Sequence, residues 1–122
     1  DYKASHSWML LISTREDWVA FYSSLPSAGT DPNTPSAEVP EINFDEYMVV
    51  AGGLGFRSSG GYNIAIENIS EGNTTLYLSA LNIRPGMNCN VAAVITYPTI
   101  AILLPKTDKA IQASLLPVKY DC

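Results

Sequence analysis

The chain has 122 residues, of which 47% are hydrophobic and 16% are charged, and its formal net charge is −5. This size suits a single domain, residues 1–122, that buries one hydrophobic core. Nucleic-acid binding needs clustered lysine and arginine, so the acidic balance and the scattered basic residues argue against it. No apolar run approaches the roughly 20 residues that cross a bilayer, so we expect no transmembrane segment in this chain. A removed signal peptide or an upstream lipid anchor is compatible with the sequence.

The N-terminal region predicts a short strand, residues 8–12, followed by one amphipathic helix. Ser13 and Thr14 are candidate N-caps, and Glu16 and Asp17 stand three residues after them, which is the spacing of a capping box. Large apolar side chains then line one helical face at intervals of three and four: Trp18, Phe21, Tyr22 and Leu25. Pro26 is expected to end the helix.

Residues 26–41 have a different composition, in which prolines alternate with Ser, Thr, Gly, Asp and Asn, and Val39 is the one bulky apolar residue. Because proline fixes φ and removes a backbone donor, we predict neither a helix nor an interior strand here. Loops of this length are often functional, and a surface insertion without a function is the alternative.

From residue 42 onward the sequence has the patterns of buried and half-buried strands. We predict strands at 47–51, 62–66, 75–81, 91–97, 99–104 and 115–118. Turn-forming residues at 70–73 join the second and third of these in a hairpin, and Pro85-Gly86 suits a type II turn. The proline in the last strand suits a sheet edge. The predicted fold class is α+β, with one N-terminal amphipathic helix packed on a mostly antiparallel sheet of five to seven strands.

No combination of residues predicts catalysis or a bound cofactor. His6 is the only histidine, and its place near the N-terminus does not suit a packed catalytic base. The acids lack the spacing of a calcium loop, and two cysteines without other soft ligands do not make a zinc site. The glycines at 52–55 lack both the Rossmann spacing and a Walker lysine, so a bend or bulge between strands explains them better. We therefore predict no enzyme, with no catalytic residue, no metal and no cofactor.

Cys89 and Cys122 are the two cysteines of the chain. A cysteine at the last position has little to pack against unless it is tied down, so we favour a disulfide between them over two free thiols. In the chain-entropy model such a bond contributes about 3–4 kcal/mol. It would also imply an oxidising compartment.

The segment 55–66, Gly-Phe-Arg-Ser-Ser-Gly-Gly-Tyr-Asn-Ile-Ala-Ile, resembles the central motif of the PrcB-type domain. In that family Ser/Thr-Gly-Gly-Tyr leads into an alternating strand. Three further features lie in the family's order along residues 9–106. They are the helix with Trp18, the stretch Ile-Asn-Phe-Asp at 42–45, and the Tyr-Pro-containing strand that ends in Pro-Lys.

Two positions depart from the family's pattern: Thr99 stands where an aromatic residue is usual, and Asn43 stands where an aspartate is usual. The resemblance implies a secreted or lipid-anchored bacterial domain without catalytic residues of its own. The family's namesake is a subunit of an extracellular complex with a subtilisin-like protease, in which it is thought to support assembly or stability.

The leading hypothesis is therefore a protein-interaction domain at the cell envelope (periplasm or outer surface) or in the secreted fraction, serving as an accessory or stabilising subunit of a protease complex. Its candidate contact region is the turn that carries Arg57, Ser59, Gly60, Gly61 and Tyr62. The loop 27–41 is a second candidate, and a purely structural role is the alternative for each.

Two other hypotheses belong to different classes. A protease inhibitor would present the loop 26–41 to an active site. A hydrolase or a small-ligand-binding domain would need a deep pocket with convergent polar groups. The identity of the partner, the oligomeric state and any longer polypeptide around this domain stay open.

Overall fold

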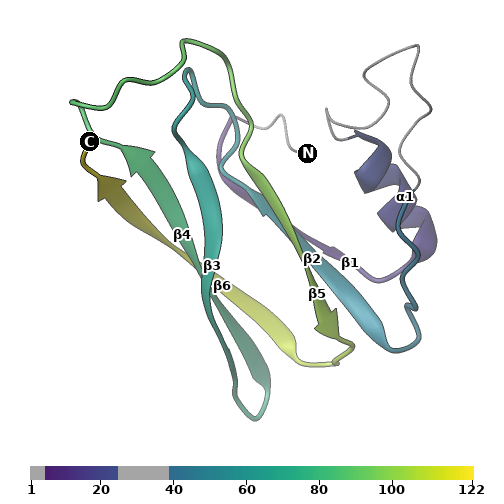
Figure 1. Cartoon of the computed structure of the whole chain (residues 1–122). Helices are drawn as coiled ribbons and strands as arrows, with labels where there is room; N and C mark the ends of the chain where they lie inside the picture. The colour runs from purple at the N-terminus through teal and green to yellow at the C-terminus, as the bar shows by residue number, and fades with distance from the viewer. Residues whose placement is uncertain (1–4, 25–38) are drawn as a thin grey trace, which may run out of the picture. The chain divides into compact units, whose positions relative to one another are not determined.

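The computed structural model describes residues 5–24 and 39–122 (Figure 1). Predictions for Leu25, Pro26 and most of the proline-rich loop lie outside these residues. The described elements are β1 (Trp8–Ile12), α1 (Arg15–Ser24), β2 (Tyr47–Gly53), β3 (Asn63–Glu71), β4 (Thr75–Pro85), β5 (Thr99–Pro105) and β6 (Ala110–Tyr120). In this part of the chain the protein is mostly β, with one short helix.

The strands form two three-stranded sheets, with the orders β1-β2-β5 and β3-β4-β6. The predicted number of strands is confirmed, but the prediction of one mostly antiparallel sheet is wrong in two respects. There are two sheets, and β6 runs parallel to β4 along its whole length. The periodicity of a sequence predicts which residues share a face of a strand, but it does not predict which strands pair. Parallel strands such as β4 and β6 are joined by a long crossover, so their pairing depends on residues far apart in the sequence.

Two further predictions between β4 and β5 are wrong. Residues 91–97 do not form a strand and make a single bridge, between Thr96 and Arg57. The turn lies two residues later than expected, because β4 continues through Pro85 and the Cys89 amide donates to the Gly86 carbonyl at 3.1 Å. The apolar composition of 91–97 suggests a buried strand, but its backbone groups bond to the glycine-rich segment described below.

The chain divides into two compact units. The larger unit consists of the described residues up to Met9, together with Gly52–Ile100 and Asp108–Cys122. The smaller unit consists of the described residues of Leu10–Ala51 together with Ala101–Thr107.

In the smaller unit, α1 has the predicted cap and the predicted buried face. The Thr14 hydroxyl accepts from the Asp17 amide at 3.2 Å, which satisfies one of the free donors at the start of the helix. Trp18 and Phe21 are buried, and the Trp18 Nε1 donates to the Pro40 carbonyl at 2.9 Å. Buried apolar residues of the strands complete this part of the core: Ile12, Met48, Val49, Val50, Ala51 and Leu104.

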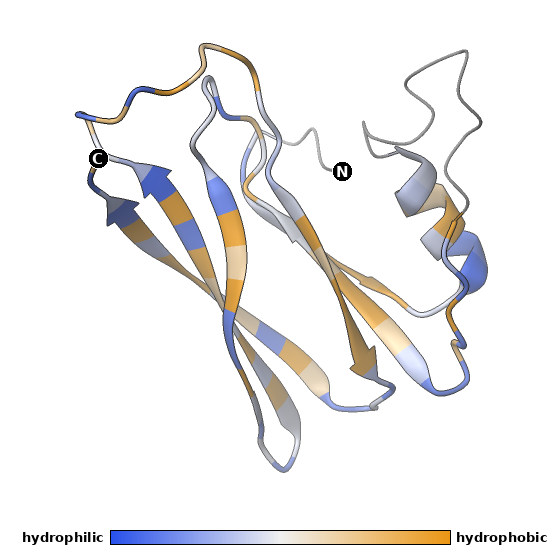
Figure 2. Ribbon diagram, viewed as in Figure 1, coloured by the Kyte–Doolittle hydropathy of each residue, from blue (hydrophilic) through white to orange (hydrophobic). Residues whose placement is uncertain are grey.

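In the larger unit, hydropathy alternates along the strands of the β3-β4-β6 sheet (Figure 2). Leu54, Ile64 and Ala80 form a buried cluster, against which Tyr62, Ile66 and Ile100 pack. The β3–β4 hairpin is antiparallel, as predicted, with a register shift between Ile66 and Asn68.

The tip of this hairpin is fastened to the start of β6 by Lys109. Its Nζ donates to the Gly72 carbonyl at 2.8 Å and forms an ion pair with Glu71. The hydrogen bond and the charge of Lys109 lower the pKa of the Glu71 carboxyl. Glu71 therefore stays ionised at neutral pH, and the contact holds the first residue of β6 in register with Thr75.

We predict that Leu54→Ala lowers the free energy of unfolding by about 2–4 kcal/mol, because Leu54 is fully buried and its removal leaves a cavity in the core of the larger unit. Thermal or denaturant unfolding measures the change. The matched control is Met87→Ala, at a side chain that is 98% exposed, which should change stability by less than about 0.5 kcal/mol. Equal effects of the two substitutions would contradict the described core.

Candidate protein-contact site

The predicted contact turn lies in the larger unit, between β2 and β3, and its backbone conformation depends on glycine. Gly61 has φ +91°, a value that residues with a side chain rarely adopt. A Cβ atom at this position would lie 2.7 Å from the Val91 Cγ1 and 3.1 Å from both the Pro85 Cγ and the Tyr120 Oη. Gly60 differs, because a Cβ atom there would meet nothing closer than 3.7 Å. Gly61 is therefore required by the close approach of three neighbours.

The turn is bonded to the segment between β4 and β5, residues 86–98, which we call the 86–98 loop. The amides of Arg57 and Thr96 each donate to the other's carbonyl, at 2.9 and 3.0 Å, and the Gly60 amide donates to the Ala92 carbonyl at 2.8 Å. The Thr96 hydroxyl donates to the Ser59 carbonyl at 2.9 Å. The backbone of the turn thus serves as a support for the loop.

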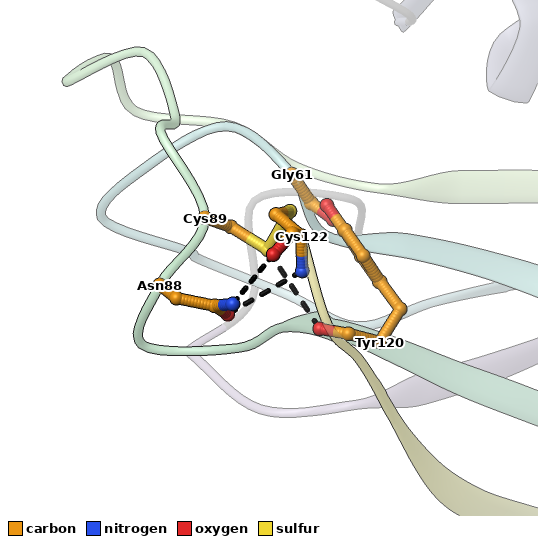
Figure 3. Close-up of a disulfide and its surroundings, with 5 residues drawn as sticks. All are labelled: Gly61, Asn88, Cys89, Tyr120 and Cys122. Atoms are coloured by element: carbon orange, nitrogen blue, oxygen red, sulfur yellow. Dashed lines mark hydrogen bonds between the residues drawn. A yellow bond between two sulfur atoms is a disulfide. The ribbon is translucent and has the colours of Figure 1, made fainter.

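The C-terminal end of β6 holds the other end of this loop (Figure 3). Cys89 and Cys122 form a disulfide, which confirms the predicted pairing. The Gly86 amide donates to the Tyr120 carbonyl at 2.8 Å, and the Tyr120 hydroxyl donates to the Gly61 carbonyl at 3.0 Å. The loop, the turn and the end of β6 are therefore three segments of one cross-linked structure.

Asn88 extends this cross-link to the last residue. Its Nδ2 donates to the Cys122 carbonyl at 2.6 Å, and its Oδ1 accepts from the Cys122 amide at 3.4 Å. The side chain thus pairs with both backbone groups of Cys122, next to the disulfide.

The structure brings together the five residues that the sequence singled out, but gives them different surroundings. Gly61 is exposed, whereas Arg57, Ser59, Gly60 and Tyr62 are half-buried. The Arg57 guanidinium lies 5.4 Å from the centre of the Tyr62 ring, and Tyr62 packs against the core cluster. These side chains shape and support the turn more than they project from it.

The side chains that do project belong to the 86–98 loop and were missed by the sequence analysis. Met87 is 98% exposed, Ile95 60% and Val94 54%, and no residue between 86 and 98 carries a charge. The segment 91–97 was predicted as a strand, and Val94 and Ile95 were not singled out as contact residues. Exposed apolar side chains on an anchored, uncharged loop suit burial against another protein.

Other kinds of site have little support in the described part of the chain. No group of three or more His, Cys, Asp or Glu residues within it could hold a metal ion. One hollow of about 100 Å³ lies over the β3-β4-β6 sheet, lined by Asn68, Ser70, Tyr77, Leu78, Ser79, Gln112, Ala113 and Ser114. No helix among the described residues has the length and apolar character to cross a membrane.

Substitutions at the paired glycines should separate their roles. We predict that Gly61→Ala lowers the free energy of unfolding by about 1–3 kcal/mol, because alanine is strained at positive φ and its Cβ would overlap Val91. Gly60→Ala, next in the sequence, should stay within about 1 kcal/mol of the unmodified chain. Chemical denaturation of the two variants tests this, and a larger loss from Gly60→Ala would refute the assigned backbone geometry.

Residues 48–105 match the family model described as PrcB C-terminal. The matched segment runs from β2 to β5 and contains both the glycine turn and the 86–98 loop. The resemblance inferred from the motif at 55–66 is therefore confirmed over these residues. No curated protein and no solved structure gives a match to the chain.

Proposed function

We propose that this chain, with its PrcB C-terminal segment, is a non-catalytic protein-interaction domain of a secreted or cell-envelope bacterial protein. We propose further that it is an accessory or stabilising subunit of an extracellular subtilisin-like protease complex. The family match supports an association with a protease complex, and the role in assembly is what the resemblance implies.

The observation that carries the proposal is the exposure of Met87, Val94 and Ile95 on a loop that is fixed at several points. Burying apolar side chains against a partner is favourable at about 25 cal/mol per Å². A loop that is ordered before binding loses little conformational entropy when the partner arrives. The absence of charge from the loop also avoids the cost of desolvating ionised groups.

The disulfide supports the proposed location. Disulfides persist in secreted and envelope proteins and are rare where thiols are kept reduced. The Cys89–Cys122 bond ties the 86–98 loop to the end of β6, so an oxidising compartment would keep the proposed binding surface in place.

The two alternatives have less support. The inhibitor hypothesis depends on the loop 26–41, of which residues 26–38 lie outside the described part of the chain. The ligand-binding hypothesis has, among the described residues, a small hollow over the β3-β4-β6 sheet. Neither has an observation comparable to the exposed side chains of the 86–98 loop.

The proposal is tested by capture of proteins from the secreted and envelope fractions of the native source, with the tagged chain as bait. We expect a subtilisin-like protease to be recovered, and Met87→Asn together with Ile95→Asn to reduce its recovery by about tenfold or more, as for central residues of an interface. Ile69→Asn, at an exposed apolar residue of β3, is the matched control and should leave recovery unchanged. Equal recovery with the loop variant and the unmodified chain would overturn the assignment of the loop, and recovery of no protease would overturn the proposed complex.

A further inference from the structure

The longer end strand of the β3-β4-β6 sheet is β6, which has 11 residues against 9 in β3. Strand β6 is an end strand of the β3-β4-β6 sheet, and its only strand partner in the described chain is β4, with which it pairs from Ala110 to Tyr120. Figure 1 shows β6, in olive to yellow, running beside β4. An end strand offers a row of backbone donors and acceptors to any further strand.

This edge lacks most of the features that keep sheet edges from pairing. Such edges are normally short, or carry charges, prolines or bulges. Residues 110–116 contain neither a charged residue nor a proline, and the pairing with β4 has no irregularity. Pro117 removes one donor, and the first seven residues of the strand are left open to a partner.

Apolar side chains accompany the open backbone on both faces of the strand. Leu116 and Val118 stand in register with Leu81 and Ile83 on one face, and Leu115 stands in register with Ala80 on the other. Leu116 is 55% exposed, and Leu115, Val118 and Tyr120 are also exposed. The side chains of a strand added beyond β6 would pack against these residues on each face of the sheet.

The two ends of β6 differ in charge. At the start, Lys109 is paired with Glu71. At the far end, Lys119 is directly opposite Arg84 on β4, and both are exposed. Neither side chain forms an ion pair or hydrogen bond with any residue that the structure describes. Like charges directly opposite one another on neighbouring strands repel, so a carboxylate brought to this position would be attracted by both.

We propose that β6 receives an extended apolar segment of a partner protein, which adds as a further strand and places a carboxylate against Arg84 and Lys119. This inference rests on the proposed function as a protein-interaction domain and adds a mode of recognition to it. In such strand addition, backbone hydrogen bonds provide the affinity and side chains the selectivity. A second copy of this chain is the poorer occupant, because Ala110–Tyr120 contains no acidic residue to meet the two cations.

The test uses a synthetic ten-residue peptide of alternating valine and threonine with one glutamate near each end, so that either strand direction offers a carboxylate. Its binding to the full chain is followed by the NMR shifts of the β6 amides. We expect shifts centred on residues 110–120, and binding at least about fivefold tighter than for the same peptide with lysines in place of the glutamates. A peptide methylated at alternate backbone nitrogens should not bind, because it cannot complete the ladder.

Charge reversal in the chain should reverse the preference. Arg84→Glu together with Lys119→Glu should favour the lysine peptide over the glutamate peptide, and the uncharged pair Arg84→Gln and Lys119→Gln should abolish the preference. Arg15→Glu, on α1, is the matched control and should leave the preference for glutamate intact. Both sets of variants lie at exposed positions, and their folding is checked by circular dichroism.

Three outcomes would overturn the inference: peptide shifts that avoid β6, equal binding of the glutamate and lysine peptides, or self-association through β6 in sedimentation velocity. The last would identify a second copy as the occupant. If the peptide does not bind but protease capture still depends on Met87 and Ile95, the inference fails and the proposed function stands. If the peptide binds β6 and no protease is captured, the proposed protease complex fails and the inference on β6 stands.

Discussion

The attachment of the end of β6 to the 86–98 loop is the constraint on which the larger unit depends. A parallel partner for β4 can be reached only through a long crossover, and closing such a connection costs entropy before any contact compensates for it. The Cys89–Cys122 disulfide joins the start of that crossover to the second residue beyond the end of β6. The Tyr120 hydroxyl, bonded to the Gly61 carbonyl, extends the attachment to the turn before β3. The sheet and the loop are therefore stabilised together.

This arrangement provides two surfaces with different chemistry on one cross-linked unit. The 86–98 loop carries exposed apolar side chains without charge, which suits a partner with a complementary apolar surface. The edge of β6 carries an open backbone ladder with two cations at one end, which suits an extended segment with a carboxylate. Both surfaces depend on Tyr120 and the disulfide, so a change at the end of β6 would affect both.

Local chemistry was predictable from the sequence, whereas long-range pairing was not. The Thr14 cap, the buried Trp18 and the β3–β4 hairpin follow from spacing and turn residues, and the structure has them. The glycine motif at 55–66 indicated the family whose model matches residues 48–105, and the five residues chosen there lie together. The parallel β4–β6 pair, the second sheet and the exposure of Ile95 could not be predicted, because each depends on contacts between segments far apart in the chain. The apolar run 91–97 shows the reason: its composition suits a strand, but its backbone groups bond to Arg57 and Gly60.

Amide hydrogen exchange in the oxidised and reduced chain tests the central claim most directly. The claim is that the disulfide and Tyr120 hold the 86–98 loop against the glycine turn, so the amides of Arg57, Gly60 and Thr96 report on it. We predict that these amides are protected in the oxidised chain and that reduction accelerates their exchange by about tenfold or more, while the amides of the β3–β4 hairpin change less. Unchanged protection of these three amides after reduction would contradict the account, because the loop would then be held without the attachment to β6.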